Sequence, residues 1–260
     1  MISTAARIGL VVLVLVPASA GASTARPPVA LTASPAHVAL AGSGRTTVRV
    51  RNAGTSQVVV DVMRAGFALD LRGRPRIVGG DAVARSAADW LSFRPHSVVL
   101  EPGGSAAVAI TSRLPSGAEP GDHDALLLFT TRRRVRDGVA VRMRMGVVVV
   151  VRAPGTVVRR LELRGLRVSP RRHHRVFELG ITNRGNVTES LARAGSTLSL
   201  FRGGRRIAKL RGEPREVRPQ TRGVLHFVYR GTARGSATAR VDIALETSSR
   251  ILGRTFRVRL

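Results

Sequence analysis

The chain has 260 residues, of which 43% are hydrophobic and only 3% aromatic, and it contains no cysteine. Its formal net charge of +27 comes from 43 Lys and Arg residues against 16 Asp and Glu residues, and Lys209 is the only lysine. Without cysteine the fold has no disulfides and depends on its hydrophobic cores. The charge favours anionic partners, although coding bias in a GC-rich genome would produce the same arginine excess. Few aromatic side chains are present to stack on bases, so we expect no nucleic-acid partner.

The first residues have the three parts of a secretory signal peptide. Arg7 supplies a positive charge, residues 8–16 are almost wholly apolar, and Ala18-Ser19-Ala20 is a small-residue cleavage site. We expect removal of residues 1–22 or 1–20, and an extracytoplasmic mature protein that is secreted or associated with the envelope of a bacterial-type cell. The apolar run is shorter than the roughly 20 residues that span a bilayer. No later segment can span one, so we expect no transmembrane anchor after cleavage.

Strand patterns dominate the first half of the mature chain. Apolar and polar residues alternate over residues 46–51, Asn52-Ala53-Gly54 then predicts a turn, and residues 58–63 form a β-branched run. A helical pattern is confined to residues 81–91, for which we expect a turn or two at most. We therefore predict one immunoglobulin-like sandwich over residues 28–152.

A later segment shows which side of one predicted strand faces the core. Residues 139–145 alternate strictly, so that Val141, Met143 and Met145 share one face and arginines occupy the other. This pattern is typical of an antiparallel sheet with one face on a core and one in water.

The same pattern restarts after a short linker at residues 152–155. Apolar and polar residues alternate over residues 177–181 and 225–229, and Asn183-Arg184-Gly185 repeats the Asn-x-Gly turn. Asn tolerates a left-handed backbone and Gly adopts one freely, so we expect both turns to use that conformation. The second sandwich is predicted over residues 156–260. The fold class is thus all-β, with two tandem immunoglobulin-like β-sandwiches after a signal peptide.

Several motifs of the first half resemble those of a known family. They are Asp89-Trp90-Leu91, the turn Glu101-Pro102-Gly103-Gly104, and Glu119-Pro120-Gly121-Asp122-His123. Together they are similar to the WxL-interacting cell-surface proteins, the domain-of-unknown-function group 916, and to the PapD-like pilus chaperones. The first resemblance implies that residues 28–152 form a domain of the type proposed to bind peptidoglycan. Members of that group usually carry a membrane helix and a basic tail after the second domain, which this sequence lacks, so anchoring does not carry over. The paired basic residues with which pilus chaperones hold the end of a subunit have no match either.

The most reactive-looking cluster is Asp122-His123-Asp124. A histidine between carboxylates could act as a general base or a metal site, but no nucleophile or third ligand accompanies it, so packing or turn capping is the favoured interpretation. We expect no enzyme activity, no metal and no cofactor.

Two other features are candidates for binding. Trp90, together with Phe93, could stack on a sugar ring, whereas burial in the core is the favoured alternative. Arg132, Arg133 and Arg134 precede a predicted hairpin tip and could hold an anion with their paired donors. Solvated arginines under coding bias are the alternative for that run.

Two functions are compatible with these observations. The first is a non-catalytic binding or scaffold protein of the cell envelope, whose partner is a wall polymer (peptidoglycan or an anionic glycopolymer) or another surface protein. The second is a PapD-like extracytoplasmic chaperone that binds a subunit by strand addition. An exposed apolar edge strand would favour the second function, and a polar cationic groove the first.

Overall fold

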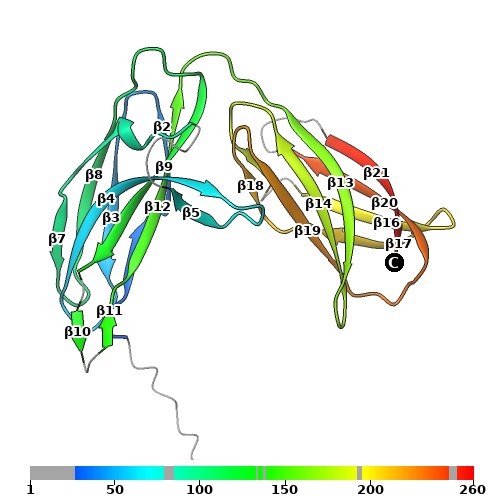
Figure 1. The fold of residues 1–260 in the computed structure, drawn as a ribbon, viewed down its shortest axis with the longest axis horizontal. Coiled ribbons are helices and arrows are strands. Elements are labelled where there is room, and N and C mark those ends of the chain that lie inside the picture. The colour runs from blue at the N-terminus through cyan, green and yellow to red at the C-terminus, as the bar shows by residue number, and fades with distance from the viewer. Residues whose placement is uncertain (1–26, 79–84, 133, 137–138, 192–194, 246–250) are drawn as a thin grey trace, which may run out of the picture.

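A computed structural model describes residues 27–78, 85–132, 134–136, 139–191, 195–245 and 251–260. The predicted signal peptide, Arg133 and residues 81–84 of the helical pattern lie outside these residues. The described chain forms two β-sandwiches side by side (Figure 1), which confirms the predicted fold class. The described part of the helical pattern contains a 3-10 helix, Ala88–Trp90. No helix in the described residues is long and apolar enough to cross a membrane.

The first sandwich packs a four-stranded sheet against a six-stranded sheet. In the four-stranded sheet the order is β1 (Leu31–Ser34), β3 (Arg45–Asn52), β8 (Ser105–Ser112) and β6 (Leu91–Arg94). The six-stranded sheet contains β2 (His37–Ala41), β12 (Arg144–Ala153), β9 (Gly121–Thr131), β4 (Val58–Leu69) and β5 (Pro75–Val78), with β7 (Ser97–Leu100) also on β4. Among the described strands, all pairings are antiparallel except that of β2 with β12, which is parallel. The short strands β10 (Arg134–Arg136) and β11 (Val139–Val141) form a separate ribbon.

Alternation along the strands produces the core of this sandwich, as the sequence predicts. Val48 and Ile110 of one sheet meet Leu127, Phe129 and Val149 of the other, all fully buried. Met143 and Met145 pack against this core, while Arg144 between them is exposed, so the predicted facing of this strand is confirmed for those residues.

The second sandwich is smaller. One sheet has the order β13 (Leu161–Pro170), β14 (Arg175–Asn183) and β19 (Arg222–Tyr229). The other has the order β17 (Arg205–Arg211), β16 (Thr197–Arg202), β20 (Ser236–Ala244) and β21 (Ile251–Arg259), and β15 (Glu189–Ser190) pairs with β18 (Glu216–Val217). Phe177, Leu179 and Phe227 meet Leu200 and Val241 in its core. Because β12 ends at Ala153 and β13 begins at Leu161, the chain crosses between the sandwiches near the predicted linker; their independence as folding units stays a prediction.

The two Asn-x-Gly turns are built alike, but for a different reason from the one predicted. Asn52 and Asn183 are fully buried, and the side-chain oxygen of each accepts the backbone N–H of the glycine two residues on, at 3.0 Å from Gly54 and 2.8 Å from Gly185. Neither turn uses a left-handed backbone, since these four residues are not among those with positive φ. Glycine is required by close approach instead, because a Cβ would lie 2.6 Å from the oxygen of Pro28 at Gly54 and 2.3 Å from that of Val158 at Gly185.

Candidate functional site

One edge of the six-stranded sheet is open over the first residues of β12. On its other side β12 pairs with β9 along its whole length, but β2 covers it only from Val148 onward. The N–H of Val148 donates at 3.1 Å to the carbonyl oxygen of Ala36, the residue just before β2. Backbone groups of a strand point to alternate sides, so those of Arg144 and Gly146 point to the same open side. No partner is found for them within the part of the chain that the structure describes.

This gap results from a change of sheet at the start of the chain. Residues 31–34 pair with β3 in the four-stranded sheet, whereas residues 37–41 pair with β12 in the opposite sheet. The change takes place over Ser34-Pro35-Ala36, and Pro35 has no N–H to continue a ladder. The residues of β1, which would otherwise extend the six-stranded sheet beside Arg144–Val147, therefore pair with the four-stranded sheet instead.

An apolar row leads across the outer face of the sheet to this edge. Met63, Leu128 and Gly146 are cross-strand neighbours in β4, β9 and β12. The next row joins Ala65, Leu126 and Val148, and Phe67 packs with Leu126 and Leu128 in a small cluster separate from the main core. Met63 is 47% exposed. A peptide added at the edge would thus meet apolar side chains beside its backbone.

Behind this edge, the same two strands hold the junction between the sandwiches. Asp122 of β9 accepts hydrogen bonds from Arg152 Nε at 2.6 Å and from the backbone N–H of Thr188 in the second sandwich at 2.7 Å. The backbone N–H of Asp122 donates to Asn186 O at 2.7 Å. Gly121 has φ +105°, and a Cβ there would lie 2.0 Å from Asn186 O. The contact is therefore close enough to require glycine, which fixes how the second sandwich meets the first.

A buried ion pair reinforces the junction. Arg218, whose side chain is 9% exposed, lies 3.0 Å from Asp124 of β9 and 3.7 Å from the centre of the Phe67 ring. Burial raises the pKa of Asp124 to about 6, although the Arg218 charge opposes that rise. Burial lowers the pKa of Arg218, yet a guanidinium stays protonated at any physiological pH. Arg218 is thus held in place by both a carboxylate and an aromatic face of the first sandwich.

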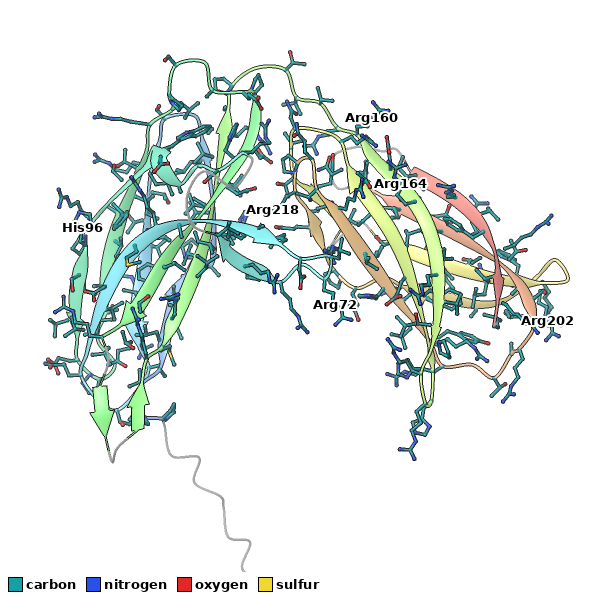
Figure 2. All side chains as sticks on the ribbon, viewed as in Figure 1. Arg72, His96, Arg160, Arg164, Arg202 and Arg218 are labelled. Atoms are coloured by element: carbon teal, nitrogen blue, oxygen red, sulfur yellow. The ribbon has the colours of Figure 1, made fainter. Side chains whose placement is uncertain are left out.

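The β4–β5 hairpin makes a further contact between the sandwiches. Leu71 O accepts the backbone N–H of Val224 in β19 at 3.1 Å, and Arg215 reaches Asp70 O at 3.5 Å. Figure 1 shows β5 extending from the first sandwich toward the second. Figure 2 shows Arg72 between the two sandwiches and Arg218 beside the β4–β5 hairpin. The relative orientation of the sandwiches therefore rests on separated contacts rather than on the linker alone.

The sequence-predicted site residues do not come together. Trp90 packs against the core and its ring centre lies 4.2 Å from that of His123, which favours the core interpretation, whereas Phe93 packs edge-on against His96. Arg132 forms an ion pair with Asp61 at 2.9 Å. The side chain of Arg134 lies outside the described part of the structure. As binding residues, Trp90, Arg132, Arg133 and Arg134 remain predictions.

The Asp122-His123-Asp124 cluster has a structural role in this arrangement. Asp122 forms an ion pair with Arg152, and Asp124 forms one with Arg218. His123 Nε2 lies 2.9 Å from Glu119 O and 3.2 Å from Arg85. Burial lowers the pKa of His123. No group of residues suited to a metal ion occurs among those described. Sequence reasoning missed the open edge of β12; the signal that could have indicated it is Pro35 between two short strand patterns.

Comparison with known proteins supports the architecture. No family model matches the chain, and no curated protein sequence matches it. Among solved structures it is similar to the class 5 fimbriae chaperone CfaA, at 12% identity and a TM-score of 0.51 over 87% of this chain and 98% of that one. The fold is PapD-like. The YadV chaperone (12% identity, TM-score 0.49, 88% and 99% covered) and the CupB2 chaperone of Pseudomonas aeruginosa (14%, 0.44, 88% and 100%) are also similar. Membership of the WxL-interacting group stays a prediction.

Proposed function

We propose that this chain is an exported, non-catalytic chaperone or adaptor that captures a segment of another exported protein by strand addition at the open edge of β12. The observation that carries the proposal is the pair of outward-facing peptide groups at Arg144 and Gly146, which no strand covers among the described residues. Main-chain hydrogen bonds at such an edge supply affinity, and the neighbouring side chains supply selectivity.

The β12 edge differs from the β13, β17 and β21 edges in how it is protected. The edge strands β17 and β21 carry exposed basic side chains, among them Arg205 and Arg206 on β17 and Arg257 and Arg259 on β21. The edge strand β13 has an irregularity between Leu163 and Leu166. Charges and bulges of this kind discourage strand pairing. The open part of β12 carries one exposed arginine, Arg144, and one glycine, Gly146, beside the apolar row of Met63 and Leu128.

The junction supports this role by fixing the strand that is offered. Arg152 near the end of β12 is tied to Asp122, and through it to the second sandwich. A strand held rigidly at one end loses less conformational entropy when a partner pairs with its other end. The PapD-like fold, shared with a fimbriae chaperone, agrees with a partner-binding role and with an extracytoplasmic location.

The alternative of a wall-bound scaffold of the WxL-interacting type uses the same fold. It differs in predicting a polymer as the partner rather than a polypeptide segment. The open edge favours the polypeptide, since a polysaccharide offers no regular row of amide groups to a sheet.

A matched pair of variants tests strand addition. In Gly146→Pro the ring replaces the outward N–H and blocks the edge, whereas Gly146→Ala adds a Cβ and keeps the N–H; that Cβ would meet flexible atoms of Leu126 at 3.3 Å. A photo-crosslinking amino acid at position 144, introduced in the native host, should trap one exported partner in wild type and in Gly146→Ala, and mass spectrometry should map the crosslink to an extended segment. Gly146→Pro should abolish the product. Equal yields in both variants, or no crosslinked protein in wild type, would contradict the proposal.

A further inference from the structure

The outer face of the four-stranded sheet carries arginines on a floor of small side chains. We call it the arginine face and define it by Arg45, Arg49, Arg51 and Arg94. All four are exposed. The other outward residues of these strands are Thr32, Ser34, Thr47, Ser92, Ser105, Ala107, Ala109 and Thr111. No side chain of that floor is larger than threonine, so the arginines rise above it.

The strand register places these arginines in successive rows. Four successive cross-strand rows contain one arginine each, and the rows are Thr32–Arg51–Ser105, Ser34–Arg49–Ala107, Thr47–Ala109–Arg94 and Arg45–Thr111–Ser92. Alternate residues of a strand lie about 7 Å apart. Along the strand direction the four charges therefore form a staggered ladder about 20 Å long in steps of about 7 Å. Arg94 lies on β6, two strands or about 10 Å to the side of the β3 arginines, so it is about 12 Å from Arg49 and from Arg45.

Among the described residues, no acidic side chain pairs with this ladder. β1, β3, β6 and β8 contain no Asp or Glu, and none of the four arginines forms an ion pair with another described residue. Arg49 and Arg51 reach only Ser105 Oγ at 3.4 Å and Gly103 O at 3.2 Å. Some exposed arginines elsewhere have acidic partners, as Arg184 has Glu162 and Arg240 has Asp242, whereas β17 and β21 also contain no Asp or Glu. The floor of small side chains, together with the lack of acid, therefore defines the arginine face.

One end of the arginine face is hollowed. A groove of about 700 Å³ lies between Arg45 and Arg94, with Phe93 and His96 at its side. Figure 2 shows His96 on the side of the first sandwich away from the second. The arginine face belongs to the four-stranded sheet, whereas β12 belongs to the six-stranded sheet. A ligand on the arginine face would therefore leave the β12 edge free.

We propose that the arginine face binds a linear polyanion, of the acidic wall-glycopolymer kind, laid along the ladder. The ligand carries carboxylates or phosphodiesters at intervals that match or divide the distances of about 7 Å and 12 Å between neighbouring arginines, and each guanidinium takes one of them through paired N–H donors. Small floor residues let the chain approach the sheet, and Phe93 offers a ring face at the groove. This binding is separate from partner capture at β12 and would hold the protein at the wall while the β12 edge binds its partner.

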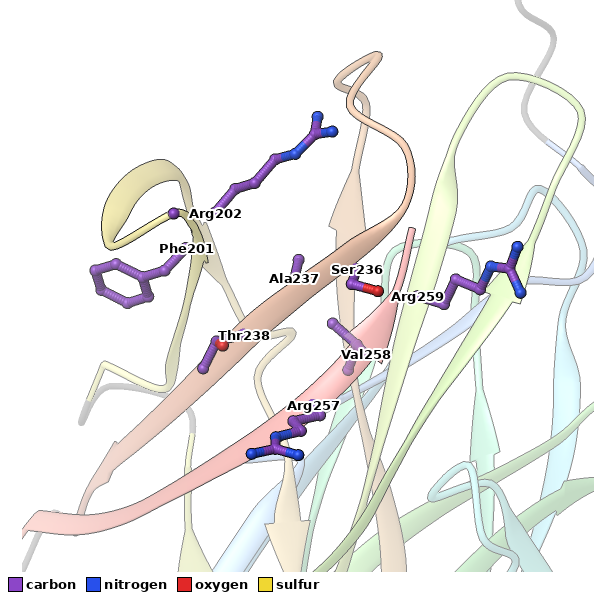
Figure 3. Close-up of a pocket in the computed structure, with 9 residues that line it drawn as sticks. Phe201, Arg202, Ser236, Ala237, Thr238, Arg257, Val258 and Arg259 are labelled. Carbon is purple, nitrogen blue, oxygen red and sulfur yellow. The ribbon is translucent and has the colours of Figure 1, made fainter.

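A second groove provides the matched control. It is lined by Arg202, Arg257 and Arg259 around Phe201 in the second sandwich. Figure 3 shows these guanidinium groups pointing away from one another, so they do not form a ladder. Replacing these three arginines and Arg205, the cross-strand neighbour of Arg202, removes the same charge without touching the arginine face.

The test measures binding of the mature protein to polygalacturonate, to inorganic polyphosphate and to neutral dextran across a salt series. Four exposed charge contacts together change affinity by about fourfold to several hundredfold, so R45S/R49S/R51S/R94S should bind the favoured polyanion more weakly by a factor in that range at 0.15 M salt. Its slope of log affinity against log salt should fall by about 3, as for four lost contacts. The control R202S/R205S/R257S/R259S should change affinity less than about threefold, and dextran should not bind.

The polymer that binds more tightly distinguishes carboxylate from phosphate as the recognised group. The double variant R49S/R94S should lose about half of the effect on a logarithmic scale, with an unchanged circular dichroism spectrum, which separates lost binding from misfolding. Equal losses in the face variant and the control would overturn the proposal, as would no binding of wild type to either polyanion at 0.05 M salt. Single-stranded DNA is measured in parallel, and tight binding of DNA without binding of either of the other two polyanions would overturn the assignment to a wall polymer.

Discussion

Arg218→Met is the most informative perturbation of the junction. Methionine keeps an apolar chain against the Phe67 ring, which lies 3.7 Å from the guanidinium in the native protein, but removes the charge 3.0 Å from Asp124. Asp124 is then a carboxyl that is 7% exposed and has no ion-pair partner. The change therefore isolates the ion pair from the packing around it.

The loss in free energy of unfolding depends on pH, because Arg218 stabilises Asp124 only when the Asp124 carboxyl is ionised. Breaking a buried ion pair costs roughly 3–5 kcal/mol. Burial places the pKa of Asp124 at about 6 in the folded protein against 3.8 in the unfolded chain. A raised carboxyl pKa means that the folded state holds the proton more tightly, so stability falls as pH rises from about 4 to 6, by roughly 3 kcal/mol. Without Arg218 that pKa rises further and the fall extends to higher pH. The variant should thus lose about 3 kcal/mol or more at pH 7.5 and about 1 kcal/mol at pH 5.

Trp90 gives a direct assay for this prediction. It is the only tryptophan, and it packs on His123, the neighbour of Asp124. Urea unfolding followed by its fluorescence should show the larger shift of midpoint at pH 7.5. The control Arg240→Met breaks an exposed pair with Asp242, in which the arginine side chain is 62% exposed, and should cost less than about 1 kcal/mol at either pH. A loss for Arg218→Met that is the same at both pH values, or below 1 kcal/mol at pH 7.5 by the same scale, would refute the reasoning.

Three further outcomes follow from individual contacts. Asn183→Ala removes hydrogen bonds to Val187 O, Val217 O and Gly185 N, so unfolding of the second sandwich in urea should require about 2–4 kcal/mol less; a loss under 1 kcal/mol would be inconsistent with the buried network. Gly121→Ala places a Cβ against Asn186 O and should open the junction, which limited proteolysis would detect as faster cleavage near residues 154–160, whereas an unchanged cleavage rate would argue that the contact is soft. Arg132→Ser removes the hydrogen bond that holds the pKa of Asp61 below its usual value, so a carbon NMR titration should show that pKa rising, and no change would mean that the pair does not persist in solution.

The sequence predicted the fold because its patterns are local. Alternation over residues 139–145 correctly assigned Met143 and Met145 to the core, and the repeated Asn-x-Gly motif correctly indicated two similar sandwiches. The reason for the glycines was wrong, since it lies in the approach of Pro28 and Val158. Contacts across more than 20 residues leave no trace in a local pattern.

The candidate site was missed for the same reason. The open edge exists because residues 31–34 and 37–41 join opposite sheets, and neither strand pattern says which sheet it joins. The pairing of Asp124 with Arg218 spans 94 positions, so the sequence showed an acidic cluster without its partner. The arginine face brings its residues into successive rows through the register of three strands, which sequence alternation alone does not determine.

Hydrogen exchange at the β12 edge tests the central claim most directly. In the free protein the amides of Arg144 and Gly146 face the open side and should exchange within seconds, whereas those of Met145 and Val147, paired with β9, should be protected. Once the crosslinked partner has been identified, adding its mapped segment as a peptide should protect Arg144 and Gly146 by at least about 100-fold while leaving Met145 and Val147 unchanged, as expected for new main-chain hydrogen bonds at a sheet edge. Protection that arises instead on β6, β17 or β21, with Arg144 and Gly146 still exchanging freely, would contradict strand addition at β12.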